Sequence, residues 1–257
     1  MFETLVISGS ALKGFASLGA LQYLDENKYL DDIHTYIGTS AGAILCYLLS
    51  IGYRPVEILV SICTGTVLDK LKNFDLVKMI NGQGAVDFIY LQQFLEKLTI
   101  DKIGHFITLK ELKDEFNKTL TCCVYNLTKK KVEYLNFENY PNLPCITALR
   151  LSSNLPLLFD NYKYMDSYYI DGGIVDNFPI QLSKSESTIG IHIKGIETIY
   201  DLKEFKLLEY IYEILFIPIN IIHKDKISKL STANNTIVTI EFNDPTLIFN
   251  FNLSSQR

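Results

Sequence analysis

Residues 36–45 read Tyr36-Ile37-Gly38-Thr39-Ser40-Ala41-Gly42-Ala43-Ile44-Leu45, and they are the most informative stretch of the chain. The pentapeptide Gly-x-Ser-x-Gly lies between a short apolar run and an apolar helical pattern, the context in which it forms a nucleophile elbow. The turn from strand into helix is then so tight that the residues two positions from the serine must lack a β-carbon, which accounts for Gly38 and Gly42. The pattern predicts that Ser40 stands clear of a sheet, with its hydroxyl beside the positive end of the following helix.

A glycine-rich turn that happens to contain a serine is the alternative interpretation. At average composition, the pentapeptide occurs by chance in roughly one chain of this length in ten. The rest of the sequence therefore has to decide between the two interpretations.

The chain around the pentapeptide alternates between strand and helix patterns. Strands are predicted over residues 5–7 and 35–37, and helices over residues 11–24 and 41–50. This order is typical of a parallel sheet with helices on its faces, so we expect a three-layer α/β/α fold with a mostly parallel central sheet. Because such a sheet places its site beyond the carboxyl ends of its strands, the loops at residues 8–11 and 38–40 should be neighbours.

The remaining patterns favour one domain over residues 1–257, with the motifs in a core of about residues 4–195. Residues 67–118 are mostly helical in pattern, with loops near 81–84 and 101–105, and we expect a helical cap or insertion that controls substrate access. Further helices are predicted over 54–63, 146–153 and 204–222, and strands over 121–125, 131–135, 164–170, 188–193 and 236–242. The tail from Asn250 should be frayed.

Composition narrows the class of protein. A hydrophobic content of 48% with 21% charged residues is that of a globular protein, and a net charge of −5 argues against a nucleic-acid partner. Five cysteines without a C-x-x-C pair, and no secretory signal, favour reduced thiols in the cytoplasm. The longest apolar runs are too short to span a bilayer, so we expect a soluble protein or one bound at a membrane surface. The four histidines have no metal-ligand spacing, so no metal is expected.

The serine needs a base to remove its proton. His192 lies inside an apolar strand pattern and His223 ends an apolar helix, so neither is presented as a base. Asp171 is the better candidate, because it ends an apolar strand and is followed by Gly172 and Gly173, which allow a sharp turn. A carboxylate is a weak base, so this pairing requires a dry pocket and strong stabilisation of the tetrahedral intermediate. The alternative is that Asp-Gly-Gly is an ordinary turn.

The segment Gly9-Ser10-Ala11-Leu12-Lys13-Gly14 is the candidate for that stabilisation. Backbone N–H groups at the start of the first helix, from Gly9, Ser10 and Ala11, would point at a developing oxyanion, and Lys13 would add a cation. A nucleotide-binding turn is the alternative, but G-x-G-x-x-G is a weak signal, and here its middle glycine is replaced by Ala11.

Together these residues resemble the patatin-like phospholipases. The family shares a Gly-rich loop with a Lys or Arg, then Gly-x-Ser-x-Gly, then Asp-Gly-Gly, which stand here as residues 9–14, 38–42 and 171–173. Residues 148–156 and 176–179 also resemble the family's stretches on either side of its Asp, so the resemblance covers roughly residues 4–195. One departure is that the family's glycine triplet is Gly9-Ser10-Ala11 in this chain.

The resemblance implies a Ser–Asp dyad with Ser40 as nucleophile and Asp171 as base, and no cofactor. It implies a lipid acyl hydrolase of the phospholipase A type that releases a fatty acid through an acyl-serine intermediate. The expected partners are a phospholipid or another acyl ester, and transiently a membrane surface. Two alternatives stay open: a catalytically weakened lipid-binding or interaction protein on the same fold, motivated by Ser10 and Ala11, and a conventional α/β-hydrolase with a catalytic histidine.

Overall fold

A computed structural model describes residues 2–185, 187–195 and 235–242, together with Tyr210, Ile211, Ile214, Ile217 and Ile221. Those five single residues are helical. The rest of the helix predicted over 204–222, His223 and the tail from Asn250 lie outside the described residues.

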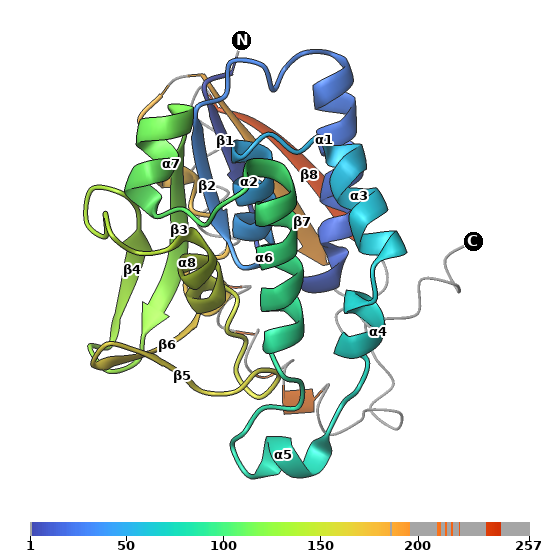
Figure 1. Cartoon of the computed structure of the whole chain (residues 1–257), viewed down its shortest axis with the longest axis vertical. Coiled ribbons are helices and arrows are strands. Elements are labelled where there is room, and N and C mark those ends of the chain that lie inside the picture. The colour runs from blue at the N-terminus through green and yellow to red at the C-terminus, as the bar shows by residue number, and fades with distance from the viewer. Residues whose placement is uncertain are drawn as a thin grey trace.

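One mixed sheet organises the described chain (Figure 1). Its strands are β1 (Thr4–Ile7), β2 (Thr35–Thr39), β3 (Thr119–Asn126), β4 (Lys131–Leu135), β5 (Tyr162–Tyr164), β6 (Ser167–Asp171), β7 (Thr188–Gly195) and β8 (Thr236–Phe242). The order is β5-β6-β3-β2-β1-β7-β8, with β4 paired to β3. The run from β3 through β2, β1 and β7 to β8 is parallel, and only β4, β5 and β6 are antiparallel to their neighbours. The predicted α/β class with a mostly parallel sheet is confirmed.

The described helices lie mainly on one face of this sheet. They are α1 (Gly14–Glu26), α2 (Ala41–Ser50), α3 (Pro55–Thr64), α4 (Val67–Leu71), α5 (Leu76–Ile80), α6 (Ile89–Ile103), α7 (Leu109–Phe116) and α8 (Cys145–Ser152). Leu5 and Ile7 of β1 point to this face and join the main core with α1, α2, α6, α7 and α8. Val6, between them, points to the opposite face and packs with Phe178 and Ile180, because successive side chains of a strand alternate. The arrangement is consistent with three layers.

Three predicted elements differ from the structure. The strand predicted over 164–170 is a hairpin, because the chain turns between β5 and β6 at Met165, whose φ is +50°. Helix α6 continues to Ile103, through most of the loop predicted at 101–105. The cap predicted over residues 67–118 is not one unit. Helices α6 and α7 bury side chains such as Leu95 and Leu112 in the main core, and only α4 and α5 project beyond that core.

Strand β3 sets the position of the candidate site. It pairs with β4 along one edge, while β2 and β6 share the other edge. Thr39, the last residue of β2, is opposite Cys123, and Asp171, the last residue of β6, is opposite the next residue, Val124. Since β2 runs parallel to β3 and β6 runs antiparallel to it, the carboxyl ends of β2 and β6 meet head to head. Ser40 and Asp171 are therefore brought together by strand pairing.

Among the described residues, no single helix has both the length and the apolar character to cross a bilayer, although the sharply bent pair α2 and α3 would pass on length and composition together.

Candidate active site

Ser40 occupies a strained elbow between β2 and α2. Its φ of 55° and ψ of −125° lie in a region that residues with a side chain rarely adopt. A β-carbon on Gly38 would lie 2.5 Å from the Ala43 nitrogen, and one on Gly42 would lie 2.4 Å from the Ile7 carbonyl oxygen. Both contacts are with backbone, so neither can be relieved by rotating a side chain. As predicted, glycine is required at both positions because a β-carbon would collide with backbone atoms.

Gly42→Ala should lower the free energy of unfolding by about 3 kcal/mol, because the new methyl group can be accommodated only if α2 moves away from β1. Gly19→Ala is the matched control, since Gly19 lies in α1 with no atom within 4 Å of its added β-carbon. It should gain about 0.5–1 kcal/mol from helix propensity. Urea denaturation measures both changes, and equal stability of the two variants would contradict the close approach of α2 to β1.

Asp171 lies within proton-transfer distance of the serine. The Ser40 hydroxyl donates to Asp171 Oδ2 over 2.5 Å, and the Gly173 N–H donates to Oδ1 over 2.6 Å. The residue is 2% exposed, and burial raises the pKa of its carboxyl to about 6, against the smaller lowering effect of these two hydrogen bonds. Such a carboxyl is ionised at neutral pH yet is a stronger base than an exposed aspartate.

A second serine, Ser152, links the elbow to β3. The Ser152 hydroxyl donates to the Cys123 carbonyl oxygen over 2.7 Å and accepts the Ser40 N–H over 3.0 Å. A β-carbon on Gly172 would lie 2.3 Å from the same Cys123 oxygen. The backbone of β3 therefore lies directly against both halves of the site, and only glycine fits after Asp171.

A buried arginine holds the strand that carries Asp171. Arg150 is 3% exposed and donates to Asn154 Oδ1 over 2.7 Å and to Asp160 Oδ1 over 2.8 Å. The Asn154 side-chain amide donates to the Tyr169 carbonyl over 2.8 Å, and the Asn154 backbone carbonyl accepts the Asp171 N–H over 2.9 Å. Arg150, Ser152 and Asn154 lie in residues 148–156. The sequence shows that this stretch resembles the family, but it does not indicate a role for any of the three residues.

The Gly-rich loop lies at the carboxyl end of β1. The Gly9 N–H donates to the Asn177 carbonyl over 3.0 Å, and the Asn177 amide donates to the Gly9 carbonyl over 2.9 Å. Ala11, where the family has glycine, has a φ of +46° and is exposed. Lys13 is buried at the end of the 3-10 helix η1 (Ala11–Lys13), and Gly14 begins α1. The Gly9 N–H is thus engaged within the fold, whereas Ala11 lines the cavity that contains Ser40.

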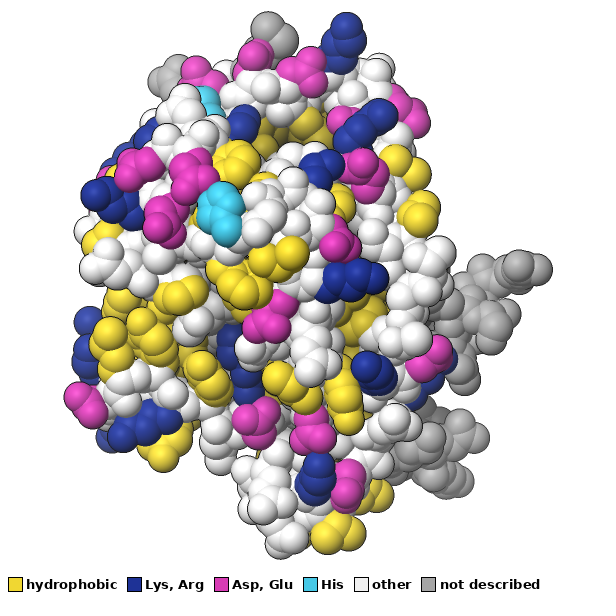
Figure 2. Space-filling view, viewed as in Figure 1, with side chains coloured by type: hydrophobic (Ala, Val, Ile, Leu, Met, Phe, Trp, Pro, Cys, Tyr) yellow, Lys and Arg dark blue, Asp and Glu magenta, His cyan; other side chains and the backbone are white. Residues whose placement is uncertain are grey.

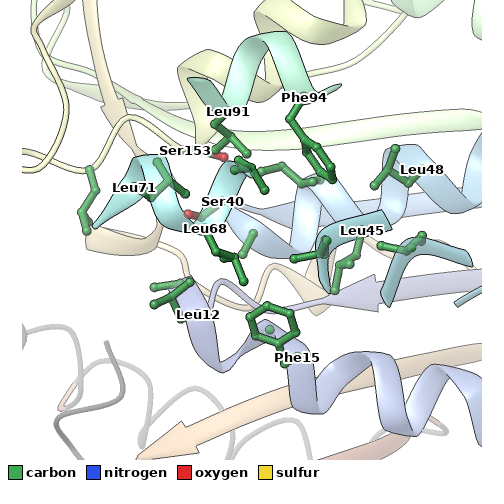
Figure 3. Close-up of a pocket in the computed structure, with 18 of the residues that line it drawn as sticks. Leu12, Phe15, Ser40, Leu45, Leu48, Leu68, Leu71, Leu91, Phe94 and Ser153 are labelled. Atoms are coloured by element: carbon green, nitrogen blue, oxygen red, sulfur yellow. The ribbon is translucent and has the colours of Figure 1, made fainter. Parts of the chain in front are cut away.

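That cavity, of about 170 Å³, is almost entirely apolar (Figure 3). Among the described side chains that line it, only Ser40 and Ser153 carry a polar atom. The Ser153 hydroxyl is buried and has no hydrogen-bond partner among the described residues. Figure 3 shows the two hydroxyl oxygens close together, with Leu71 on one side of them and Leu45 and Leu48 of α2 on the other. The cavity thus combines two neighbouring hydroxyl groups with long apolar walls.

The described histidines lie on other parts of the fold. His34 and His105 are exposed, and His105 pairs with Glu115. His192 is buried in β7, separated from β2 by β1, with its ring 5.1 Å from that of Phe178. The described hydrogen-bond partner of the Ser40 hydroxyl is therefore the Asp171 carboxylate.

The chain matches the family model described as "Patatin-like phospholipase" over residues 5–183. It is 36% identical over 188 residues to "Probable lipid hydrolase 463L" of Invertebrate iridescent virus 6, an alignment that covers 71% of this chain and 63% of that protein. It is 29% identical over 204 residues to "Uncharacterized protein YqhO" of Bacillus subtilis (strain 168), covering 72% of this chain and 68% of that one. The chain therefore spans less than two thirds of the viral relative's length.

Two solved structures share the fold. VipD from Legionella pneumophila superposes with a TM-score of 0.56 at 17% identity, covering 95% of this chain and 62% of VipD. ExoU, in its heterodimeric complex with SpcU from the type III secretion system of Pseudomonas aeruginosa, superposes with a TM-score of 0.51 at 19% identity. That match covers 97% of this chain and 49% of ExoU. At these identities the likeness extends to the fold alone.

Proposed function

The chain belongs to the patatin-like phospholipase family, and on that premise we propose that it is a lipid acyl hydrolase of the phospholipase A type. Its reaction would cleave the fatty-acyl ester of a glycerophospholipid through an acyl-serine intermediate on Ser40. The observation that carries the proposal is the 2.5 Å hydrogen bond to a buried Asp171 from the hydroxyl of Ser40, which lines an apolar cavity.

In the acylation step, Asp171 Oδ2 takes the hydroxyl proton of Ser40 while Oγ attacks the ester carbonyl carbon. The tetrahedral intermediate collapses when its carbon–oxygen bond to the leaving group breaks, and the proton on Asp171 passes to the departing alcohol. In deacylation, Asp171 takes a proton from water, the hydroxide attacks the acyl-serine, and the fatty acid leaves as Ser40 recovers its proton.

The negative charge of the intermediate needs donors at the Gly-rich loop. Because the Gly9 N–H is bonded to Asn177, we assign this role to the N–H groups of Ser10 and Ala11, at the start of η1. Lys13, the last residue of η1, and Gly14, the first residue of α1, would support the loop. Backbone donors survive the replacement of glycine, so this departure from the family pattern is compatible with activity.

The cavity would hold the acyl chain. It follows one side of α2 from Ala41 to Leu48, a length of roughly 10 Å at the rise of an α-helix. Each methylene transferred from water to such walls contributes about 0.8 kcal/mol, so a long acyl chain is favoured over a short one.

Two measurements test the proposal. A fluorophosphonate probe should label Ser40, identified by peptide mass spectrometry, because only an activated serine reacts. Incubation with a mixed glycerophospholipid panel should release fatty acids that mass spectrometry identifies. Vesicle binding without labelling or release would favour the alternative of a lipid-binding protein on the same fold.

Ser153 would hydrogen-bond the bound ester, since its hydroxyl is buried in the cavity beside Ser40 without a described partner. Ser153→Ala should raise KM about threefold to tenfold, the effect of losing one neutral hydrogen bond. Its folded stability should not fall, because no protein partner is left unpaired.

The neighbouring Ser152→Ala is the matched control for this prediction. It removes the hydroxyl that bridges Ser40 and Cys123, so it should cost about 1–3 kcal/mol of folding free energy. Steady-state kinetics and thermal unfolding of both variants separate the two roles. A loss of stability in Ser153→Ala without a change in KM would contradict the assignment.

A further inference from the structure

Helix α5 presents an exposed apolar face. Leu76, Val77 and Ile80 are 56, 69 and 79% exposed, and their spacing places all three on one side of the helix. In Figure 1 α5 projects at the lower end of the molecule, and in Figure 2 some hydrophobic side chains are visible at that tip beside charged ones. An apolar cluster of this kind on a projecting element marks a surface for a protein or a membrane.

The inner side of α5 packs on the wall of the acyl cavity. Phe74 and Met79 are partly buried against an apolar cluster, several of whose members also line the cavity: Val67, Leu68, Leu71, Val86, Leu158 and Phe159. Hydrogen bonds from the Asp75 N–H to the Ala85 carbonyl, and from the Ala85 N–H to the Leu157 carbonyl, tie the segment to the loop after α8. Helix α5 thus has its exposed face on one side and the cavity wall on the other.

The charges around α5 balance. Residues 67–89 contain three lysines and three aspartates, although the whole chain has a net charge of −5. Lys72 pairs with Asp69, Lys78 pairs with Asp87, and Asp75 caps α5 by accepting the N–H groups of Val77 and Lys78. Residues 67–89 therefore carry no excess of positive charge to attract anionic lipid, and what this segment presents to a partner is apolar area.

We infer that α5 is the element by which this protein docks on an electroneutral phospholipid surface. Leu76, Val77 and Ile80 would enter the boundary between headgroups and acyl chains, as apolar faces of interfacial helices do. Docking there places the apolar wall of the cavity against the lipid, so an acyl chain can move toward Ser40 without crossing water. The inference rests on the proposed function for its substrate, but the surface can be tested separately.

The test measures binding to phosphatidylcholine vesicles by co-sedimentation, in a Ser40→Ala background that leaves the lipid intact. The triple variant Leu76→Gln, Val77→Gln, Ile80→Gln should partition about tenfold less than its parent, because the apolar area is lost while helix propensity is kept. The matched control is Tyr23→Gln, Ile100→Gln, Phe106→Gln, which removes exposed apolar side chains near the carboxyl end of α1 and at or just after the carboxyl end of α6. It should partition like the parent, and salt between about 0.05 and 0.5 M should change neither result.

Enzyme activity, measured in proteins that retain Ser40, gives a second and independent test of the role of α5. The α5 variant should hydrolyse a soluble short-chain ester at the unaltered rate and phosphatidylcholine vesicles about tenfold more slowly. Equal vesicle binding by the α5 variant and its parent, binding that requires anionic lipid, or a dimer that the α5 variant abolishes would each overturn the inference. Failure of all ester hydrolysis would instead overturn the proposed function, and the binding result would still decide the role of α5.

Discussion

Ser40→Ala should lower ester hydrolysis by about 10⁴- to 10⁶-fold, the loss typical of removing the nucleophile of a serine hydrolase. The buried Asp171 would not substitute for the missing hydroxyl, because its carboxylate accepts the Gly173 N–H and, in the proposed mechanism, serves as the base. The rate of fatty-acid release from phosphatidylcholine measures this loss. Substantial activity in Ser40→Ala would place the chemistry at another residue.

Ser40→Gly provides the control that separates chemistry from strain. It is equally without a hydroxyl, but glycine adopts a φ of 55° and a ψ of −125° readily, whereas alanine keeps the β-carbon. The glycine variant should therefore be about 1 kcal/mol more stable than the alanine variant, after the larger entropy of unfolded glycine is subtracted. Equal unfolding midpoints for the two variants would contradict a strained elbow.

The parts of the fold that sequence predicts are those with a local signal. The elbow carries such a local signal, because Gly38 and Gly42 are required by contacts within β2–α2 and with the neighbouring β1. The alternation of strands and helices up to Ser50 follows from hydrophobic spacing and agrees with β1, α1, β2 and α2. Asp171 was identified because an acid at a strand end precedes two glycines.

The parts that sequence does not predict depend on distant contacts. Nothing near residue 124 indicates that β6 will pair there and align Asp171 with Ser40, because the two strands are far apart along the chain. The turn at Met165 lacks the usual glycine or asparagine, so the tyrosine-rich hairpin resembles one strand. The hydrogen bond from the Gly9 N–H to the Asn177 carbonyl joins the first motif to the stretch that follows Asp171. These residues are far apart in the sequence, so only the folded chain reveals their contact.

Asp171→Asn should lower kcat by about 10²- to 10⁴-fold, because an amide cannot take the proton of Ser40. The wild-type protein should show a matching pH dependence. Since burial raises the pKa of Asp171 to about 6, kcat/KM should be level above pH 7 and fall below pH 6 as the base is protonated. A level profile through pH 5, or full activity of the asparagine variant, would exclude Asp171 as the base.

The same substitution should make the protein more stable at neutral pH. The carboxyl has a pKa of about 6 in the folded chain against a reference value of 3.8, so the folded state binds its proton more tightly than the unfolded state does. Stability is therefore lost as the pH rises from about 4 to 6, by about 2–3 kcal/mol. Asparagine carries no charge and keeps an acceptor for the Gly173 N–H, so Asp171→Asn should unfold at a higher temperature than wild type at pH 8. The difference should vanish near pH 4, where wild-type Asp171 is protonated in the folded state. An inactive variant that is also less stable at pH 8 would mean that the carboxylate holds the fold together; greater stability would mean that the fold keeps a buried charge for its chemistry.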